Sequence, residues 1–192
     1  MEIIMNTANK LTIIRVVLVP VFMALLMIDN RICRFAALGV FVLASVTDAL
    51  DGHIARTRNQ ITTFGKFADP LADKILTTAA FLVFLGLDVY HPVGGTVALM
   101  IIMTREFMVA GVRLSAVGEG KVVAASMWGK LKTVAQMIAI IITVLIMAVF
   151  PEGYTAGASG IVIEILLWIT VLFTVISGGE YLIKNWSLMK LK

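Results

Sequence analysis

The sequence predicts an all-α integral membrane protein with six transmembrane helices. Of its 192 residues 60% are hydrophobic, and the mean hydropathy of +0.99 lies far above that of soluble globular proteins. The apolar residues lie in runs of about 20, the length that an α-helix needs to cross a bilayer. A soluble fold would leave these runs facing water. We therefore expect one membrane domain covering residues 1–192.

Turn-forming residues divide the apolar runs into three pairs. The first pair is divided at Asp29-Asn30, the second at His91-Pro92, and the third by residues 151–160, which contain three glycines. Polar and mostly basic stretches separate one pair from the next. In chain order, the predicted membrane helices are residues 11–29, 34–55, 71–89, 93–115, 131–150 and 160–183.

The basic residues predict the orientation of the chain in the cell membrane. Arg31 and Arg34 lie on one side of the six-helix arrangement, and twelve Lys and Arg residues lie at or near its loops and ends on the other. Because basic loops stay in the cytoplasm, both termini and residues 56–70 are predicted to be cytoplasmic. The twelve are Lys10, Arg15, Arg56, Arg58, Lys66, Lys74, Lys121, Lys130, Lys132, Lys184, Lys190 and Lys192.

Composition excludes several other classes of protein. The net charge of +4 does not indicate a nucleic-acid partner, because the basic residues occur in short segments between apolar runs. Membrane lipids, particularly anionic ones, are the expected partner. A single cysteine, Cys33, excludes an internal disulfide and a cysteine metal cluster. Before Lys10, the apolar Ile3, Ile4 and Met5 among polar neighbours indicate a short interfacial helix.

Four aspartates flank the break between the second and third predicted helices. Asp48 and Asp51 are three positions apart at the end of one helix, and Asp69 and Asp73 are four positions apart at the start of the next. At these spacings each pair shares a helix face. If the two helices run antiparallel, both pairs lie at the same depth and form a cage of carboxylate oxygens.

Such a cage suits divalent metal ions. Each carboxylate at membrane depth costs about 2.5 to 3.5 kcal/mol on insertion scales, and neighbouring carboxylates repel one another. Two bound cations would offset both costs, and ligands that are all oxygen favour Mg²⁺ or Mn²⁺. A competing interpretation has the aspartates capping helices and pairing with surface Arg and Lys. It explains one aspartate at each helix end, but not two pairs.

Small and basic residues beside the aspartates favour a phosphorylated ligand. Gly52 and Ala55 continue the face of Asp48 and Asp51, so a nucleotide can approach the helix backbone there. Arg56 and Lys66 could then bind diphosphate oxygens that the metal ions do not reach. This division of labour is typical of phosphoryl transfer.

The spacing of these residues is similar to the signature of a known family. Residues 48–73 read DxxDGxxARx8GxxxDxxxD without a gap, which resembles the CDP-alcohol phosphatidyltransferases. Residues 9–12 leading to Arg15, residues 104–107 leading to Arg113, and residues 129–136 resemble the branch of the family that uses glycerol 3-phosphate.

Two positions depart from the pattern of that branch. Ala8 stands where the branch often has proline, and Gly179 stands where Gly178 is usually followed by a larger residue. Neither position belongs to the acidic cage.

The resemblance implies a six-helix fold, usually a homodimer, that binds CDP-diacylglycerol and two divalent ions. It implies Asp48, Asp51 and Asp69 as metal ligands, and Asp73 as a further ligand or the general base. The acceptor hydroxyl would attack the β-phosphorus in line, releasing CMP. The residues implied to contact the CDP moiety are Asp48, Gly52, Ala55, Arg56, Gly65 and Asp69.

A glycerol 3-phosphate acceptor, used in making anionic phospholipid, needs fixed positive charge beside the cage. Arg105 and Arg113 can face inward together, since eight residues bring them within ~80° around a helix. Arg105 lies well inside the fourth predicted membrane helix and therefore needs a partner, either Glu106, an aspartate or the substrate phosphate. Lys130 and Lys132 are weaker candidates, because lysines at a helix start also bind lipid headgroups.

Two alternatives remain at this point. The same cage is compatible with serine, inositol phosphate, choline or phosphatidylglycerol as acceptor, although the two arginines favour a phosphorylated one. A divalent-cation transporter also holds membrane carboxylates, but its site is expected near the middle of the membrane, between broken helices or repeated halves. Here the acidic residues are confined to one hairpin at one surface.

Overall fold

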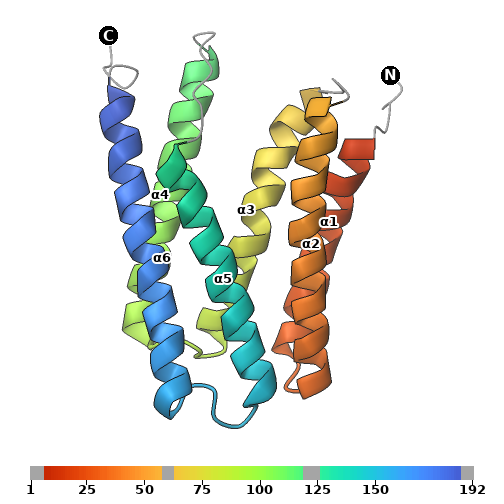
Figure 1. Ribbon diagram of the computed structural model, residues 1–192, viewed down its shortest axis with the longest axis vertical. Helices are drawn as coiled ribbons and strands as arrows, with labels where there is room; N and C mark the ends of the chain where they lie inside the picture. Colours follow the sequence, from red (N-terminus) through yellow and green to blue (C-terminus); the bar gives the residue numbers. More distant parts are fainter. Residues whose placement is uncertain (1–6, 58–62, 119–125, 187–192) are drawn as a thin grey trace. The chain divides into compact units, whose positions relative to one another are not determined.

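The all-α prediction is confirmed in the described part of the chain. The computed structural model describes the backbone of residues 7–57, 63–118 and 126–186, and the side chains of residues 13–47, 74–113 and 126–186. Within these ranges it contains six α-helices (Figure 1): α1 Thr7–Met27, α2 Arg31–Thr57, α3 Thr63–Gly86, α4 Pro92–Gly118, α5 Met127–Val149 and α6 Gly157–Lys184. The interfacial helix predicted from Ile3, Ile4 and Met5 lies outside the described residues.

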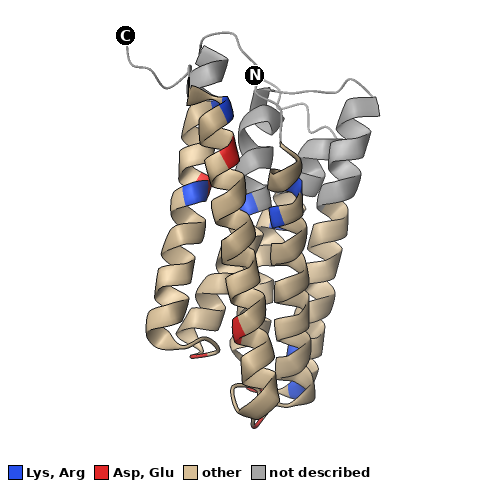
Figure 2. Cartoon of the chain, turned by 60° about the vertical axis from the view of Figure 1, so that its left-hand side comes forward, with Lys and Arg blue, Asp and Glu red and all other residues tan. Residues whose placement is uncertain are grey.

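The chain is a multi-pass membrane protein. Among the described residues, three helices are long and apolar enough to cross a bilayer, over Pro92–Arg113, Met127–Val149 and Gly157–Lys184. The described parts of α1 and α3 add shorter apolar helices, Ile13–Met27 and Lys74–Gly86. Figure 2 shows that Lys, Arg, Asp and Glu leave long stretches of the described helices uncharged.

Three helices begin at the turns that the sequence predicts, and in each a particular residue favours the helix start. The Asn30 side chain caps α2 by accepting a hydrogen bond from the backbone N–H of Ile32 at 2.8 Å. Pro92 opens α4, where its missing N–H costs nothing. Gly157, the first residue of α6, has a φ of +58°, which favours glycine.

Most helices extend beyond the apolar segments that predicted them. The largest difference is in α3, which starts at Thr63 rather than at residue 71. Backbone hydrogen bonding continues a helix through polar residues, whereas a hydropathy window ends where the charges begin. Asp69 therefore lies more than one turn inside α3, and Asp73 lies a further turn on.

Contacts divide the chain into two compact units, and the single domain over residues 1–192 stays a prediction. Unit 1 comprises Met1–Leu87 and Ile140–Tyr154, so it contains α1, α2, α3 and the second half of α5. Its helices α1, α2 and α3 alternate in direction (Figure 1), and α1 packs on both others. Phe22 and Phe41 are fully buried there, with ring centroids 5.5 Å apart.

Unit 1 is also held by a buried arginine, Arg34, whose side chain is only 4% exposed. Its guanidinium donates to the carbonyl of Met147 at 2.8 Å and to the Asp29 carboxylate at 2.7 Å. It also lies 5.1 Å from the ring centroid of Tyr154. Arg34 thus ties the start of α2 to the end of α5.

Unit 2 comprises Asp88–Ala139 and Thr155–Lys192, and so contains α4, the first half of α5 and α6. Helices α4 and α6 are in contact and run in the same direction (Figure 1). The buried hydroxyls of Thr170, Thr174 and Ser177 bond back to carbonyls of α6 itself. Because these hydroxyls are satisfied within the helix, α6 can bury them without further partners.

Candidate active site

The two acidic pairs belong to neighbouring antiparallel helices of unit 1. Asp48 and Asp51 lie in the last turns of α2, and Asp69 and Asp73 lie in the first half of α3. Helices α2 and α3 are in contact and run in opposite directions. The side chains of all four aspartates lie outside the described residues, so the cage itself stays a prediction.

The predicted CDP-binding residues fall on the same two helices. Gly52, Ala55 and Arg56 follow the first acidic pair on α2, and Gly65 lies in the first turn of α3. Their side-chain surroundings also lie outside the described residues. The four aspartates of α2 and α3 offer only carboxylate oxygens as metal ligands. Such ligands suit two Mg²⁺ or Mn²⁺ ions and do not suit a soft metal.

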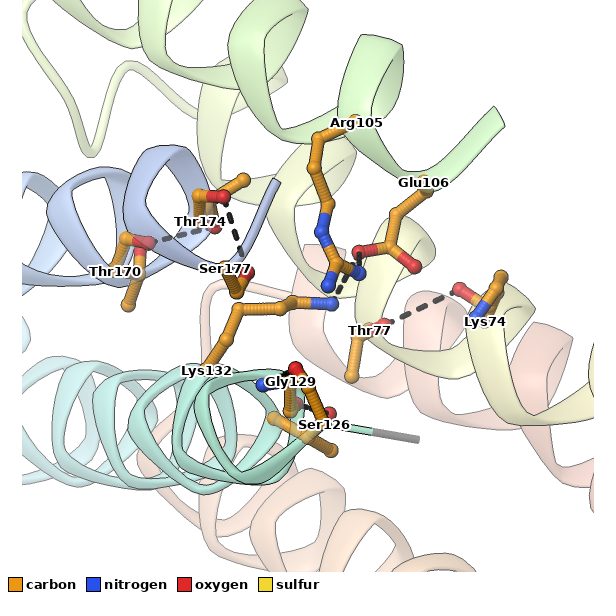
Figure 3. Close-up of polar contacts among 11 residues, drawn as sticks. Lys74, Thr77, Arg105, Glu106, Ser126, Gly129, Lys132, Thr170, Thr174 and Ser177 are labelled. Carbon is orange, nitrogen blue, oxygen red and sulfur yellow. Dashed lines mark hydrogen bonds and ion pairs between the residues drawn. The ribbon is translucent and has the colours of Figure 1, made fainter. Parts of the chain in front are cut away.

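In unit 2, a buried ionic cluster joins α4 to α5. Glu106 and Lys132 are 7% and 5% exposed, and the Lys132 ammonium pairs with Oε1 of Glu106. Nη1 of Arg105 donates to the same oxygen at 3.2 Å. Figure 3 shows the three side chains converging. One carboxylate therefore holds two cations side by side, and the three residues together carry a charge of +1.

Glycines make room for the Arg105 side chain. A Cβ atom added at Gly178 on α6 would lie 3.1 Å from Cγ of Arg105, and one added at Gly129 on α5 would lie 3.6 Å from its Nη2. The Nε atom of Arg105 is buried and has no hydrogen-bond acceptor among the described residues. Arg105 also borders a groove of about 330 Å³ between α4 and α6.

The start of α5 lies next to this cluster. The Ser126 hydroxyl accepts a hydrogen bond from the backbone N–H of Gly129 at 3.1 Å, which caps the helix (Figure 3). Ser126 thus fixes the first turn of α5, the helix that also carries Lys132.

The four residues predicted to bind the acceptor phosphate occupy different surroundings. The structure brings Arg105 and Lys132 together through Glu106. It places the Arg113 guanidinium over the Tyr181 ring, 5.9 Å from its centroid. Lys130 is exposed on α5. Arg105 and Lys132 are therefore the stronger candidates, which reverses the order in which the sequence ranks Lys132 and Arg113.

Sequence reasoning missed Glu106 as the shared partner of two cations. It considered a pair between Arg105 and Glu106 but placed Lys132 at the membrane surface. The available signal was that Lys132 is followed by an α5 segment without any charge, from residue 133 to residue 149. A lysine beside so long an apolar run either reaches the headgroups or pairs with a counter-ion, and Glu106 is the acidic residue in the neighbouring predicted helix.

Arg15 of α1 was expected either to approach a headgroup or to stabilise the bundle. Its side chain is fully buried, at 1% exposure, within unit 1. This burial is compatible with both roles.

Comparison with known proteins assigns the chain to a family. Residues 5–176 match the model of the CDP-alcohol phosphatidyltransferases. A Bacillus subtilis protein named CDP-diacylglycerol--glycerol-3-phosphate 3-phosphatidyltransferase is 39% identical, over 96% of this chain and 97% of its own length. A Rickettsia prowazekii protein of the same name is 38% identical, over 94% and 96%. A Mycobacterium tuberculosis protein named probable phosphatidylglycerophosphate synthase is 36% identical, over 93% and 80%. The chain belongs to the CDP-alcohol phosphatidyltransferase family.

Proposed function

We propose that this protein transfers the phosphatidyl group of CDP-diacylglycerol to glycerol 3-phosphate, giving phosphatidylglycerophosphate and CMP. The observation that carries the proposal is similarity over more than nine-tenths of the chain to relatives named for this reaction or for its product. This similarity favours a transferase over the divalent-cation transporter that the acidic hairpin alone would allow.

The aspartates of α2 and α3 are proposed to bind two divalent ions. Asp48, Asp51 and Asp69 would act as ligands, and Asp73 as a ligand or the general base. When bound, Mg²⁺ or Mn²⁺ would stabilise negative charge on the phosphoryl oxygens. Arg56 and the small residues Gly52, Ala55 and Gly65 would bind the CDP moiety.

The reaction is a substitution at phosphorus. The acceptor hydroxyl oxygen forms a bond to the phosphorus atom that carries diacylglycerol, and the bond from that phosphorus to the oxygen of CMP breaks. The hydroxyl proton goes to the carboxylate of Asp73 if that residue is the base. Asp73 otherwise orients the hydroxyl.

The two cations of the ionic cluster in unit 2 favour a phosphorylated acceptor. Arg105 and Lys132 would bind the phosphate of glycerol 3-phosphate, and the buried Nε of Arg105 would gain an acceptor. Serine and choline carry no phosphate to satisfy these donors. Arg113 and Lys130 are proposed to add further positive charge to the site.

The topology is proposed from the distribution of basic residues. All six helices would cross the membrane, with both termini and the acidic ends of α2 and α3 on the cytoplasmic side. This places the site where water-soluble glycerol 3-phosphate is available while the diacylglycerol tails remain in the bilayer. A homodimer is proposed from the family resemblance.

A substrate panel tests the proposal. Purified protein is supplied with CDP-diacylglycerol, Mg²⁺ or Mn²⁺, and glycerol 3-phosphate, serine, inositol phosphate or choline, and CMP is measured. We expect CMP and a labelled lipid only with glycerol 3-phosphate, and neither in the presence of EDTA. Turnover with another acceptor and none with glycerol 3-phosphate would overturn the assignment.

A further inference from the structure

We infer that Glu106 is a positioning residue that sets both the geometry and the net charge of the acceptor-phosphate site. The inference rests on the proposed function, because it takes Arg105 and Lys132 as the residues that bind the acceptor's phosphate. Glu106 itself contacts these two cations and is not proposed to contact the substrate.

The first argument is geometric. Arg105 and Lys132 both contact the same oxygen of Glu106, although Arg105 lies on α4 and Lys132 lies on α5. Lys132 is 26 residues from Glu106 in the sequence. The ammonium group of a lysine is carried on a flexible four-carbon stem that loses much rotamer freedom when fixed. Glu106 restricts that freedom, so the bound phosphate is held in one orientation and the acceptor hydroxyl is positioned for attack.

The second argument concerns charge. Glu106 offsets part of the repulsion between Arg105 and Lys132, two like charges whose side chains are only 11% and 6% exposed. Glu106 lowers the summed charge of these three side chains from +2 to +1. A phosphate dianion is then attracted strongly enough to bind, yet less strongly than by a site of charge +2, so the phosphorylated product can leave.

The surroundings of Arg105 support a fixed arrangement. Its stem lies against Gly178 of α6 and its guanidinium lies near Gly129 of α5, so each of these helices limits its movement on one side. The Glu106 carboxylate therefore binds an Arg105 side chain whose conformation the two glycine contacts already restrict. The combined effect is a pair of donors with a defined separation.

Two substitutions separate charge from geometry. Glu106→Gln removes the charge and keeps the size of the side chain, whereas Glu106→Asp keeps the charge and shortens the reach by one methylene group. For Glu106→Gln we expect the KM for glycerol 3-phosphate to fall roughly three- to tenfold, because an opposing charge is gone, while kcat falls by about tenfold or more, because the cations are no longer positioned. For Glu106→Asp we expect an almost unchanged KM and a kcat lowered by about tenfold.

The matched control is Glu164→Gln on α6. Glu164 accepts a hydrogen bond from the His91 backbone N–H at 2.6 Å, and the glutamine side-chain oxygen can still accept it. This variant should keep the wild-type KM and kcat. The midpoint of thermal unfolding in detergent is measured for all variants.

Opposite changes of KM and kcat in Glu106→Gln would support the inference, since a merely structural carboxylate would give a lower unfolding midpoint and a raised KM. If Glu106→Gln does not fold, Glu106→Asp decides: a wild-type kcat overturns the inference. Failure of the proposed function is distinguishable, because wild-type protein would then release no CMP with glycerol 3-phosphate.

Discussion

Gly178 of α6 lies directly against the stem of Arg105 on α4, where an added Cβ would lie 3.1 Å from Cγ of the arginine. The next residue, Gly179, has nothing within 4 Å of its Cβ position. The same substitution at two successive positions therefore meets a crowded site and an open one.

Gly178→Ala should disturb Arg105, whereas Gly179→Ala should not. Both alanines gain about 1 kcal/mol in helix propensity, and crowding at position 178 costs about 1 to 3 kcal/mol. We expect Gly179→Ala to raise the midpoint of thermal unfolding, and Gly178→Ala to leave it unchanged or lower it while raising the KM for glycerol 3-phosphate. Equal midpoints and equal KM values would contradict the contact.

The two lysines of α5 should differ in function. Lys132 is buried against Glu106, and Lys130 is exposed two residues earlier. Loss of a charge-assisted bond to phosphate costs about 1.5 to 3 kcal/mol, so Lys132→Met should raise the KM for glycerol 3-phosphate by roughly ten- to a hundredfold. Lys130→Met serves as the matched control, with an expected change below about threefold. A larger effect at Lys130 would reverse our ranking of the two residues.

Replacing Arg34 should affect stability rather than catalysis. Arg34→Met removes the donors that serve Met147 and Asp29, and should lower the free energy of unfolding by about 2 to 3 kcal/mol. Arg31→Met is the control, since Arg31 is exposed and contacts only the Phe35 ring among its described contacts. Denaturation in detergent measures the difference, and kcat per folded molecule should match that of wild type. An equal loss of stability in both variants would show that the contacts of Arg34 with Met147 and Asp29 do not stabilise unit 1.

Asparagine substitutions should distinguish the aspartates that bind metal from the one that acts as the general base. Asp48→Asn, Asp51→Asn and Asp69→Asn should each remove several kcal/mol of transition-state stabilisation, or on the order of 10³-fold in kcat, with weaker Mn²⁺ binding. Asp73→Asn should lower kcat by about 10² to 10⁴-fold and keep Mn²⁺ binding if Asp73 is the base. Substantial activity in Asp73→Asn with Mn²⁺ bound would exclude that role.

Asp88→Asn is the control for these four variants. Asp88 has a φ of +52°, and asparagine tolerates this left-handed conformation as well as aspartate does. The variant should keep both activity and Mn²⁺ binding. A comparable loss at Asp88 would show that the four aspartates act through general stability instead of through metal ions.

Much of the fold could be predicted because hydropathy and turn residues mark the ends of membrane helices. The turns at Asp29-Asn30 and His91-Pro92 were placed correctly, since capping and helix-breaking act locally. The start of α3 at Thr63 was missed because polar residues can continue a helix outside the apolar segment. Hydropathy reports the solvent around a helix, not its hydrogen bonding.

The candidate site was predictable where its residues lie close together in the sequence. The acidic pairs of α2 and α3 follow a fixed spacing, so helix geometry predicts a shared face for each pair. The partnership of Glu106 with Lys132 joins α4 to α5, and spacing along one helix carries no information about it. Contacts between distant segments depend on how helices pack.

Anomalous diffraction from crystals grown with Mn²⁺ and a CDP-diacylglycerol analogue tests the central claim most directly. The account predicts two manganese peaks between α2 and α3, each within coordinating distance of carboxylates from among Asp48, Asp51, Asp69 and Asp73, with the diphosphate beside them. A map in which these carboxylates point into separate surroundings, with manganese bound elsewhere or not at all, would contradict it.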